Sequence, residues 1–270
     1  MKLSYAFKRF KLFASRVSHP ASLIIISSML IMMNSGCGKK GPVRPKLTTP
    51  PSAPEELTLW QQGNLFVLGW TIPSAGLIGG GEEDVTGFRI RRLTYDAAED
   101  CPTCRDPQVV TAELDLKSPA PGQRIGNRMY WRDLDIRPGR GYRYAITPQI
   151  LGGQEGPAAT IHLAAQQPPP SPTDLQVEAG DARVVVQWTA PVLPDGMQLV
   201  GFNLYRRQAQ RPFPIVPVNA KPLQATRLLD RGLDNGRAYE YRVSALVRSG
   251  DQLLESMASP GALITPQEGR

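Results

Sequence analysis

Apolar and polar residues alternate in short runs along most of the chain. Phe66, Leu68 and Trp70 occupy every second position. The same period of two recurs in further runs, at residues 88–90, 142–146, 184–188, 202–204 and 239–245. Gly, Pro, Asn and Asp separate these runs, and no segment has the 3.6-residue apolar stripe of an amphipathic helix. The pattern therefore predicts short antiparallel strands and an all-β protein.

The strand pattern occurs twice. Trp70 begins the sequence WTIP, and Trp188 begins WTAP 118 residues later. Tyr142 and Tyr239 each open a Tyr-x-Tyr run, but they are only 97 residues apart. The falling offset means that the first copy has longer loops, chiefly between residues 90 and 133. About seven strands in each copy indicate two tandem antiparallel β-sandwiches.

Both copies resemble the fibronectin type III domain, an immunoglobulin-like sandwich. Each opens with P-x-x-L and has a Trp followed shortly by Pro. Residues 133–144 read DLDIRPGRGYRY and residues 230–241 read DRGLDNGRAYEY, against the family's D-x-x-L-x-P-G-x-x-Y-x-Y, with Asn235 in place of the family's Pro. The resemblance implies that Trp70 and Trp188 are core indoles. It likewise implies that Tyr142 and Tyr239 are corner tyrosines, hydrogen-bonded to nearby backbone.

These patterns predict the organisation of the chain. The expected parts are a signal peptide at 1–36, a Pro-rich tether at 37–53, a first fibronectin type III-like domain at 54–165, a Pro-rich joint at 166–171 and a second such domain at 172–266. Proline removes backbone donors and stiffens the chain, so the tether and the joint are expected to be extended.

The first 36 residues have the three parts of an export signal. They contain five basic residues and no acidic one, and an uncharged run, ASLIIISSMLIMM, follows at residues 21–33. The sequence Ser35-Gly36-Cys37 then resembles the cleavage site of bacterial lipoproteins, although Asn34 stands where that family usually has Leu. The resemblance implies cleavage before Cys37 and acylation of Cys37, with palmitate among the chains. An ordinary cleaved signal and a short uncleaved anchor are the alternatives.

The residues that follow Cys37 bear on localisation. Cys37-Gly-Lys-Lys-Gly-Pro resembles the start of small outer-membrane lipoproteins of Gram-negative bacteria, some of which assist assembly of the lipopolysaccharide export machinery. Gly38, rather than Asp, fits sorting to the outer membrane in that family. Lys39 and Lys40 also fit a basic spacer against anionic headgroups. We expect a lipid anchor in the cell envelope, most simply at the outer membrane, facing the periplasm or the surface.

The distribution of charge argues against a nucleic-acid partner. The formal net charge is +7, but the first 36 residues supply five of these charges. The remaining chain holds 26 basic and 24 acidic residues, which is close to balance.

Cys101-Pro-Thr-Cys104 is the one motif in the sequence that suggests a disulfide, a redox pair or a metal site. In an oxidising compartment the two thiols favour a disulfide that fixes a loop. A thioredoxin-type redox pair needs a strand–helix context that the surrounding Pro, Asp and Gly do not offer, and a structural zinc site needs four ligands. The disulfide is our prediction, with a redox pair and a shared metal site as alternatives.

The other residues that could form a functional site have simpler structural interpretations. His162 ends a strand-like run and has no nucleophile pattern beside it, so a surface position is the simple interpretation. The Gly79–Asp84 segment lacks the Lys-Ser/Thr of a phosphate loop. A solvated loop is the interpretation of this segment, and a calcium contact through its three acidic residues is the alternative. The basic strand ends carry Arg89, Arg91, Arg92, Arg206 and Arg207. An outward sheet face is the simple interpretation of these arginines, and binding to an acidic glycan or to lipopolysaccharide phosphates is the alternative.

We therefore expect a non-enzymatic, membrane-anchored envelope lipoprotein that serves as a structural or protein-interaction module. No catalytic residue, metal ligand or cofactor is expected. The anticipated partners are the membrane, through the lipid anchor, and an envelope protein or glycan. The alternatives are a CxxC redox or metal protein, a polysaccharide-binding protein and an accessory factor in envelope assembly.

Overall fold

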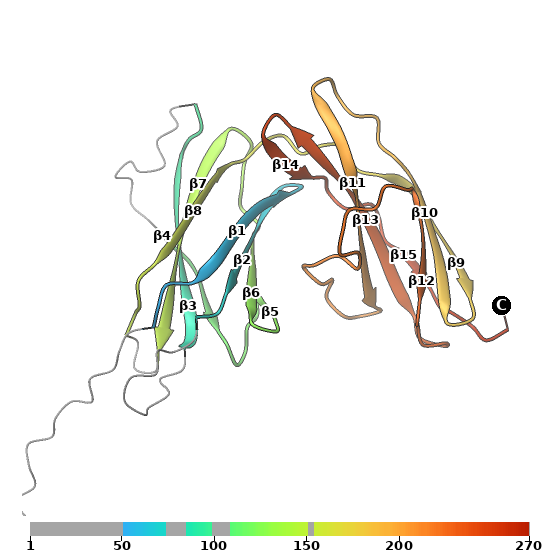
Figure 1. Cartoon of the computed structure of the whole chain (residues 1–270), viewed down its shortest axis with the longest axis horizontal. Coiled ribbons are helices and arrows are strands. Elements are labelled where there is room, and N and C mark those ends of the chain that lie inside the picture. The colour runs from blue at the N-terminus through green and yellow to red at the C-terminus, as the bar shows by residue number, and fades with distance from the viewer. Residues whose placement is uncertain (1–50, 74–84, 99–108, 151–153, 270) are drawn as a thin grey trace, which may run out of the picture. The chain divides into compact units, whose positions relative to one another are not determined.

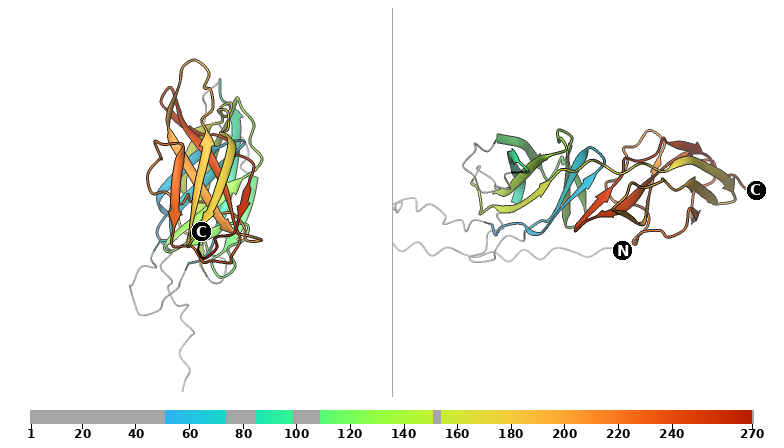
Figure 2. Two further views of the ribbon diagram at one scale, coloured as in Figure 1. Left: turned by 90° about the vertical axis from the view of Figure 1, so that its right-hand side faces the viewer. Right: turned by 90° about the horizontal axis from the view of Figure 1, so that it is seen from above.

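A computed structural model describes residues 51–73, 85–98, 109–150 and 154–269. These residues form strands and connecting turns and contain no helix, so the predicted all-β fold is confirmed. The strands fall into two groups along the chain, here called the first half and the second half (Figures 1 and 2).

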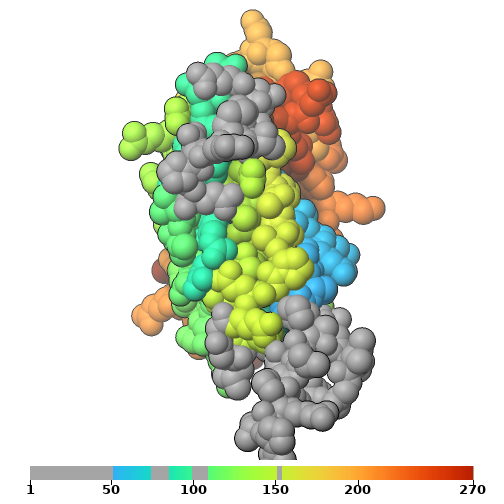
Figure 3. Space-filling view, turned by 90° about the vertical axis from the view of Figure 1, so that its left-hand side faces the viewer, coloured from blue at the N-terminus to red at the C-terminus, as the bar shows by residue number. Residues whose placement is uncertain are grey.

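The described residues of the first half form eight strands. They are β1 (Glu55–Gln62), β2 (Leu65–Thr71), β3 (Val85–Asp96), β4 (Val109–Asp115), β5 (Gln123–Ile125), β6 (Arg128–Asp133), β7 (Arg140–Ile150) and β8 (Ala159–Ala164). Strands β1, β2, β6 and β5 are neighbours in one sheet, and β4, β3, β7 and β8 form the other. Figure 3 shows β8, in yellow-green, on the surface beside the blue of β1.

The second half contains seven strands. They are β9 (Thr173–Gly180), β10 (Arg183–Thr189), β11 (Met197–Gln208), β12 (Arg227–Arg231), β13 (Tyr239–Ser249), β14 (Gln252–Glu255) and β15 (Ala262–Ile264). Strands β12, β10 and β9 form one sheet, and β11, β13, β14 and β15 pair in the other. Every pairing within either half is antiparallel.

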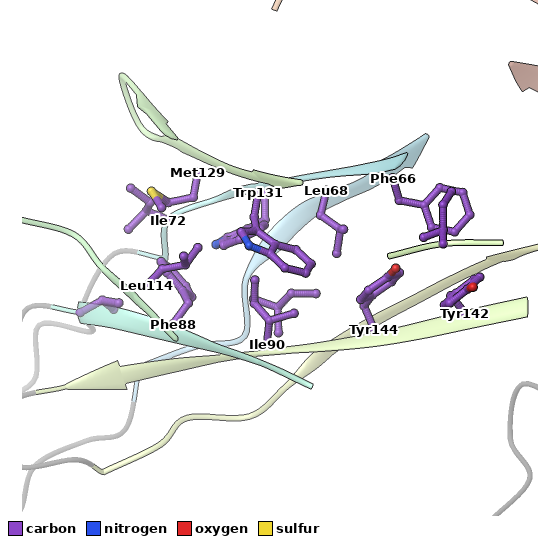
Figure 4. Packing of buried hydrophobic residues seen from close by; sticks show 14 of the residues in the cluster. Phe66, Leu68, Ile72, Phe88, Ile90, Leu114, Met129, Trp131, Tyr142 and Tyr144 are labelled. Carbon is purple, nitrogen blue, oxygen red and sulfur yellow. The ribbon is translucent and has the colours of Figure 1, made fainter. Parts of the chain in front are cut away.

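Each half encloses its own hydrophobic core, because alternate residues on facing sheets point inward. In the first half, Phe66 and Leu68 of β2 face Ile90 of β3 and Tyr144 of β7 (Figure 4). In the second half, the core includes Val184, Val186, Phe202, Leu204, Tyr241 and Val243. The alternation seen in the sequence thus identifies the inward faces.

A parallel contact joins the two halves into a continuous sheet. Gln61 and Gln62 of β1 pair with Leu254 and Glu255 of β14, so that the strand order runs β11-β13-β14-β1-β2-β6-β5. This pairing is one part of an extensive junction between the two halves.

Candidate functional site

The two core indoles have matching environments. Trp70 is fully buried and packs edge-on against Phe88, with ring centroids 5.2 Å apart. Trp188 is 5% exposed and packs edge-on against Phe202, with centroids 5.4 Å apart. Within the described residues, neither indole Nε1 has a hydrogen-bond partner. Both side chains therefore contribute through packing.

Each half also contains a buried aspartate that accepts a tyrosine hydroxyl. Tyr144 donates to Asp133 Oδ2 at 2.7 Å, and Arg92 Nη1 lies 2.8 Å from the same oxygen. Asp230 repeats this arrangement with Tyr241 in the second half, at 2.7 Å. Burial raises the pKa of Tyr144 and Tyr241, and the carboxylate that each hydroxyl contacts raises it further.

Tyr142 and Tyr239, two positions before these tyrosines, each accept a hydrogen bond from the backbone of the preceding turn. The Arg137 backbone N–H donates to Tyr142 Oη at 2.8 Å, and the Asp234 N–H donates to Tyr239 Oη at 3.2 Å. Arg92, which pairs with Asp133, also lies over the Tyr142 ring, 5.5 Å from its centroid. In the second half, Arg206 pairs with Asp230 and lies 5.7 Å from the centroid of the Tyr239 ring.

The basic strand ends are held by neighbouring carboxylates. Arg89 Nε donates to Glu113 at 2.7 Å, and Arg91 pairs with Glu155 at 3.2 Å. Arg207 Nε donates to Glu240 at 2.7 Å. Because these guanidinium groups already have anionic partners within the fold, they are poor candidates for binding an external phosphate or glycan.

Hydrogen bonds from polar side chains stabilise the junction between the two halves beside the Pro-rich joint. Gln61 is buried, and its Nε2 donates to the carbonyl oxygens of Gly63 at 2.9 Å and Gln166 at 2.7 Å. The Gln166 backbone N–H returns a hydrogen bond to Gln61 Oε1 at 2.9 Å, and its side chain donates to Gln252 at 2.6 Å. The joint is therefore tied to β1 and to β14.

A buried glutamate lies at the centre of the junction. Glu255 is 2% exposed and accepts hydrogen bonds from Tyr205 at 2.7 Å, from Gln62 at 3.2 Å and from Ser244. Burial raises the pKa of Tyr205, and Glu255 adds to the shift. This network links β1 of the first half to β11, β13 and β14 of the second.

A third apolar cluster covers the outer face of β2 and β6. Val67 and Tyr130 of the first half are buried against Ile215, which follows β11, and Trp60, Leu65 and Val216 pack around them. The Ile215 backbone N–H donates to Gln123 Oε1 at 2.9 Å. Ile215 and Val216 of the second half thus pack onto the first half.

Beside this cluster the junction is hollowed. A cavity of about 390 Å³, here called the junction recess, is lined by Gln62, Asn64, Leu65, Arg132, Leu134, Tyr205, Phe213, Pro214, Arg242, Met257 and Ala258. Another hollow of about 420 Å³, around Trp60, Tyr130 and Val216, lies against the same cluster. Both draw their walls from the two halves.

Two arginines give the junction recess its polarity. Arg242 lies 4.5 Å from the Phe213 ring centroid and pairs with Glu240 at 3.3 Å. Arg132 is half-buried and donates from Nη2 to the Pro214 carbonyl oxygen at 3.3 Å. Burial lowers the pKa of Arg132, while Tyr205 and Glu255 oppose that shift. The recess therefore combines a partly desolvated cation with apolar walls.

The sequence-predicted sites divide into three groups. Trp70, Trp188, Tyr142 and Tyr239 are buried, and His162 is exposed on β8. Cys37, the Cys101–Cys104 pair and the Gly79–Asp84 segment lie outside the described residues. Within the described ranges there is no cluster of three or more His, Cys, Asp or Glu that could hold a metal, and no helix long and apolar enough to cross a membrane.

Sequence reasoning missed the junction. One signal was available: β2 reads LFVLGWT, with apolar residues on both faces, and five consecutive residues of this strand are buried. A strand that is buried on both faces must pack against another layer on each face. For β2, one layer is the core of the first half and the other is the second half.

Comparison with known proteins identifies one part of the chain. Residues 169–260 match the fibronectin type III domain family, a range that spans β9 to β14. The FN1–FN3 domains of chicken CNTN1 are similar at 15% identity and a TM-score of 0.31, covering 82% of this chain and 68% of that one. A myokine structure is similar at 24% identity and a TM-score of 0.29, covering 37% of this chain and 99% of that one. A fibronectin type III domain is thus found in the second half, and such a domain suggests a structural or interaction module.

Proposed function

We propose that this chain is a non-enzymatic lipoprotein of the cell envelope that holds a two-domain interaction module at a membrane. The junction supports the interaction role in this proposal. Hydrogen bonds and apolar contacts join the two halves, and residues from both halves line the recess. A surface of this kind suits protein recognition, because its parts are fixed before a partner binds.

The first half is, in this proposal, a diverged second fibronectin type III domain. Its support is the repetition of one set of contacts: the Trp70–Phe88 and Trp188–Phe202 pairs, and the Tyr–Asp–Arg groups around Asp133 and Asp230. Matching side-chain networks at matching places in two sandwiches favour a common fold for both.

The membrane anchor rests on the sequence around Cys37. Metabolic labelling with a palmitate analogue, followed by membrane fractionation, tests it. The parent chain should be labelled and retained with membranes, and Cys37→Ser should lose both properties. Label and retention that persist in Cys37→Ser would show that the anchor is assigned wrongly.

The interaction role is tested in intact envelopes with a photocrosslinking amino acid. Leu134, which is 73% exposed at the rim of the junction recess, is the test position. Val192, which is 91% exposed and does not line the recess, is the matched apolar control. A discrete crosslinked protein from position 134 and none from position 192 would support the proposal. The same products from both positions would contradict it.

A further inference from the structure

Arg132 differs from most other half-buried arginines that the structure describes. Arg89, Arg91, Arg92, Arg128, Arg206, Arg207 and Arg242 each form an ion pair with a carboxylate. Arg132 forms none within the described ranges, and the one hydrogen bond that its side chain makes there goes to the neutral carbonyl of Pro214. A guanidinium has five N–H donors, so most of its hydrogen-bonding capacity is not used by these residues.

The buried glutamate of the junction, Glu255, is engaged by other groups. Burial lowers the pKa of Arg132 and the charge of Glu255 only opposes that shift, because the two side chains form no ion pair. The Oε1 atom of Glu255 is already the acceptor for Tyr205, Gln62 and Ser244. Burying part of a cation without an anionic partner is costly, so an external anion at Arg132 would be bound favourably.

The walls of the junction recess favour a particular kind of anion. Leu65, Pro214 and Ala258 line it, and Leu134 and Met257 expose 73% and 52% of their surface. Apolar side chains beside a guanidinium suit a ligand that carries an alkyl or aromatic group next to its carboxylate. A phosphorylated glycan would place hydroxyl groups against these apolar walls, where the hydroxyl groups would lack hydrogen-bond partners.

The size of the recess agrees with a short anchoring segment. Its volume of about 390 Å³ lies near the lower end of ligand pockets, which range over roughly 300–1,000 Å³. We infer that the junction recess binds an acidic segment of a partner protein, with an Asp or Glu carboxylate on the Arg132 guanidinium and a neighbouring apolar side chain against Leu134 and Met257. This inference rests on the proposed interaction role and names the chemistry of its partner.

Direct binding to the purified full chain in detergent tests the inference. The probe is a fluorescein-labelled, end-capped hexapeptide of alternating Leu and Glu, and its control has Gln in place of every Glu. Fluorescence anisotropy should show saturable binding of the Glu peptide that weakens as salt is added. The Gln peptide should bind at least about tenfold more weakly, because a buried charge pair is lost.

Variants assign the binding to this recess. Arg132→Gln should weaken binding at least about tenfold, whereas Arg132→Lys should keep part of it, because the charge remains without the planar fork. Leu134→Ser alters an exposed rim residue, so it should weaken binding without affecting folding. Arg231→Gln, on the exposed surface of β12 away from the recess, should bind like the parent chain.

The outcomes separate this inference from the proposed function. Equal binding of the Glu and Gln peptides, or unchanged binding by both Arg132→Gln and Leu134→Ser, would overturn the acidic-segment site. Binding of purified lipopolysaccharide through Arg132, with no binding of the Glu peptide, would also overturn it. A failed Cys37→Ser experiment, by contrast, would remove the membrane anchor and leave peptide binding by the purified chain unchanged.

Discussion

Tyr241 donates a hydrogen bond from its hydroxyl to Asp230 at 2.7 Å, and both side chains are buried. Tyr144 and Asp133 repeat this contact at the same distance in the first half. In each case an arginine completes the group from a neighbouring strand, Arg206 in one half and Arg92 in the other. The contact links the start of a turn to the strand that follows it, so it is expected to stabilise both.

Removing either hydroxyl should therefore destabilise the fold. Tyr241→Phe and Tyr144→Phe should each lower the free energy of unfolding by about 1–3 kcal/mol, because a buried carboxylate loses a donor. Urea unfolding followed by tryptophan fluorescence measures the change. Tyr130→Phe is the matched control and should cost less, since Arg128, which donates to Tyr130 Oη, keeps its bond to Glu56 at 2.7 Å. Equal losses in all three variants would contradict this assignment.

The strands were predictable because a period of two is a local property. Phe66, Leu68 and Trp70 reveal the inward face of β2 without any knowledge of its partners. The corner tyrosines were equally accessible through the motif that contains them. The acceptor role of Asp133 was not, because it depends on how β3, β6 and β7 are placed against one another.

The junction lies beyond such local reasoning for a similar reason. Val67 is apolar on the face of β2 that alternation assigns to solvent, which signals a cover but does not identify it. The cover is the segment around Ile215, from the other half of the chain. The partial burial of Arg132 likewise could not be predicted, because it depends on the distant segment around Pro214 that packs against this strand.

High pH should destabilise the protein through its buried tyrosines. Burial raises the pKa of Tyr144, Tyr205 and Tyr241 above the ordinary value of about 10. A group whose pKa is raised by folding contributes stability below its unfolded pKa and loses it as pH rises further. Stability from these groups should hold up to about pH 10 and then fall, by about 1.4 kcal/mol per pH unit for each tyrosine.

Unfolding titrations in urea from neutral to alkaline pH, with tyrosinate absorbance recorded in parallel, would test this dependence. Tyr205→Phe should reduce the alkaline slope by about one proton, because one raised group is removed. Tyrosinate absorbance from all the tyrosines at moderately alkaline pH, in a chain that remains folded, would disprove the prediction.

The thiols of Cys101 and Cys104 should be oxidised in exported protein. Denatured chain purified without reductant should show no free thiol, and reduction should release two, since Cys37 is the only other cysteine and is expected to carry lipid. Cys101→Ser should expose one thiol before reduction. Two free thiols in the exported parent chain would instead favour the redox or metal alternatives for this pair.

A matched pair of glycine variants tests the junction. Gly63 and Gly126 have nearly the same left-handed backbone, with φ of +56° and +58°. An added Cβ at Gly63 would lie 2.6 Å from Met257 Cγ and 3.1 Å from Met257 Cα, whereas at Gly126 nothing lies within 4 Å. Both Ala variants share a conformational cost of roughly 1–2 kcal/mol, and Gly63→Ala should lose about 1–3 kcal/mol more through overpacking. Urea unfolding measures both changes. Equal losses would mean that Gly63 and Met257 can separate freely, and the junction would then not be the rigid contact on which the recess depends.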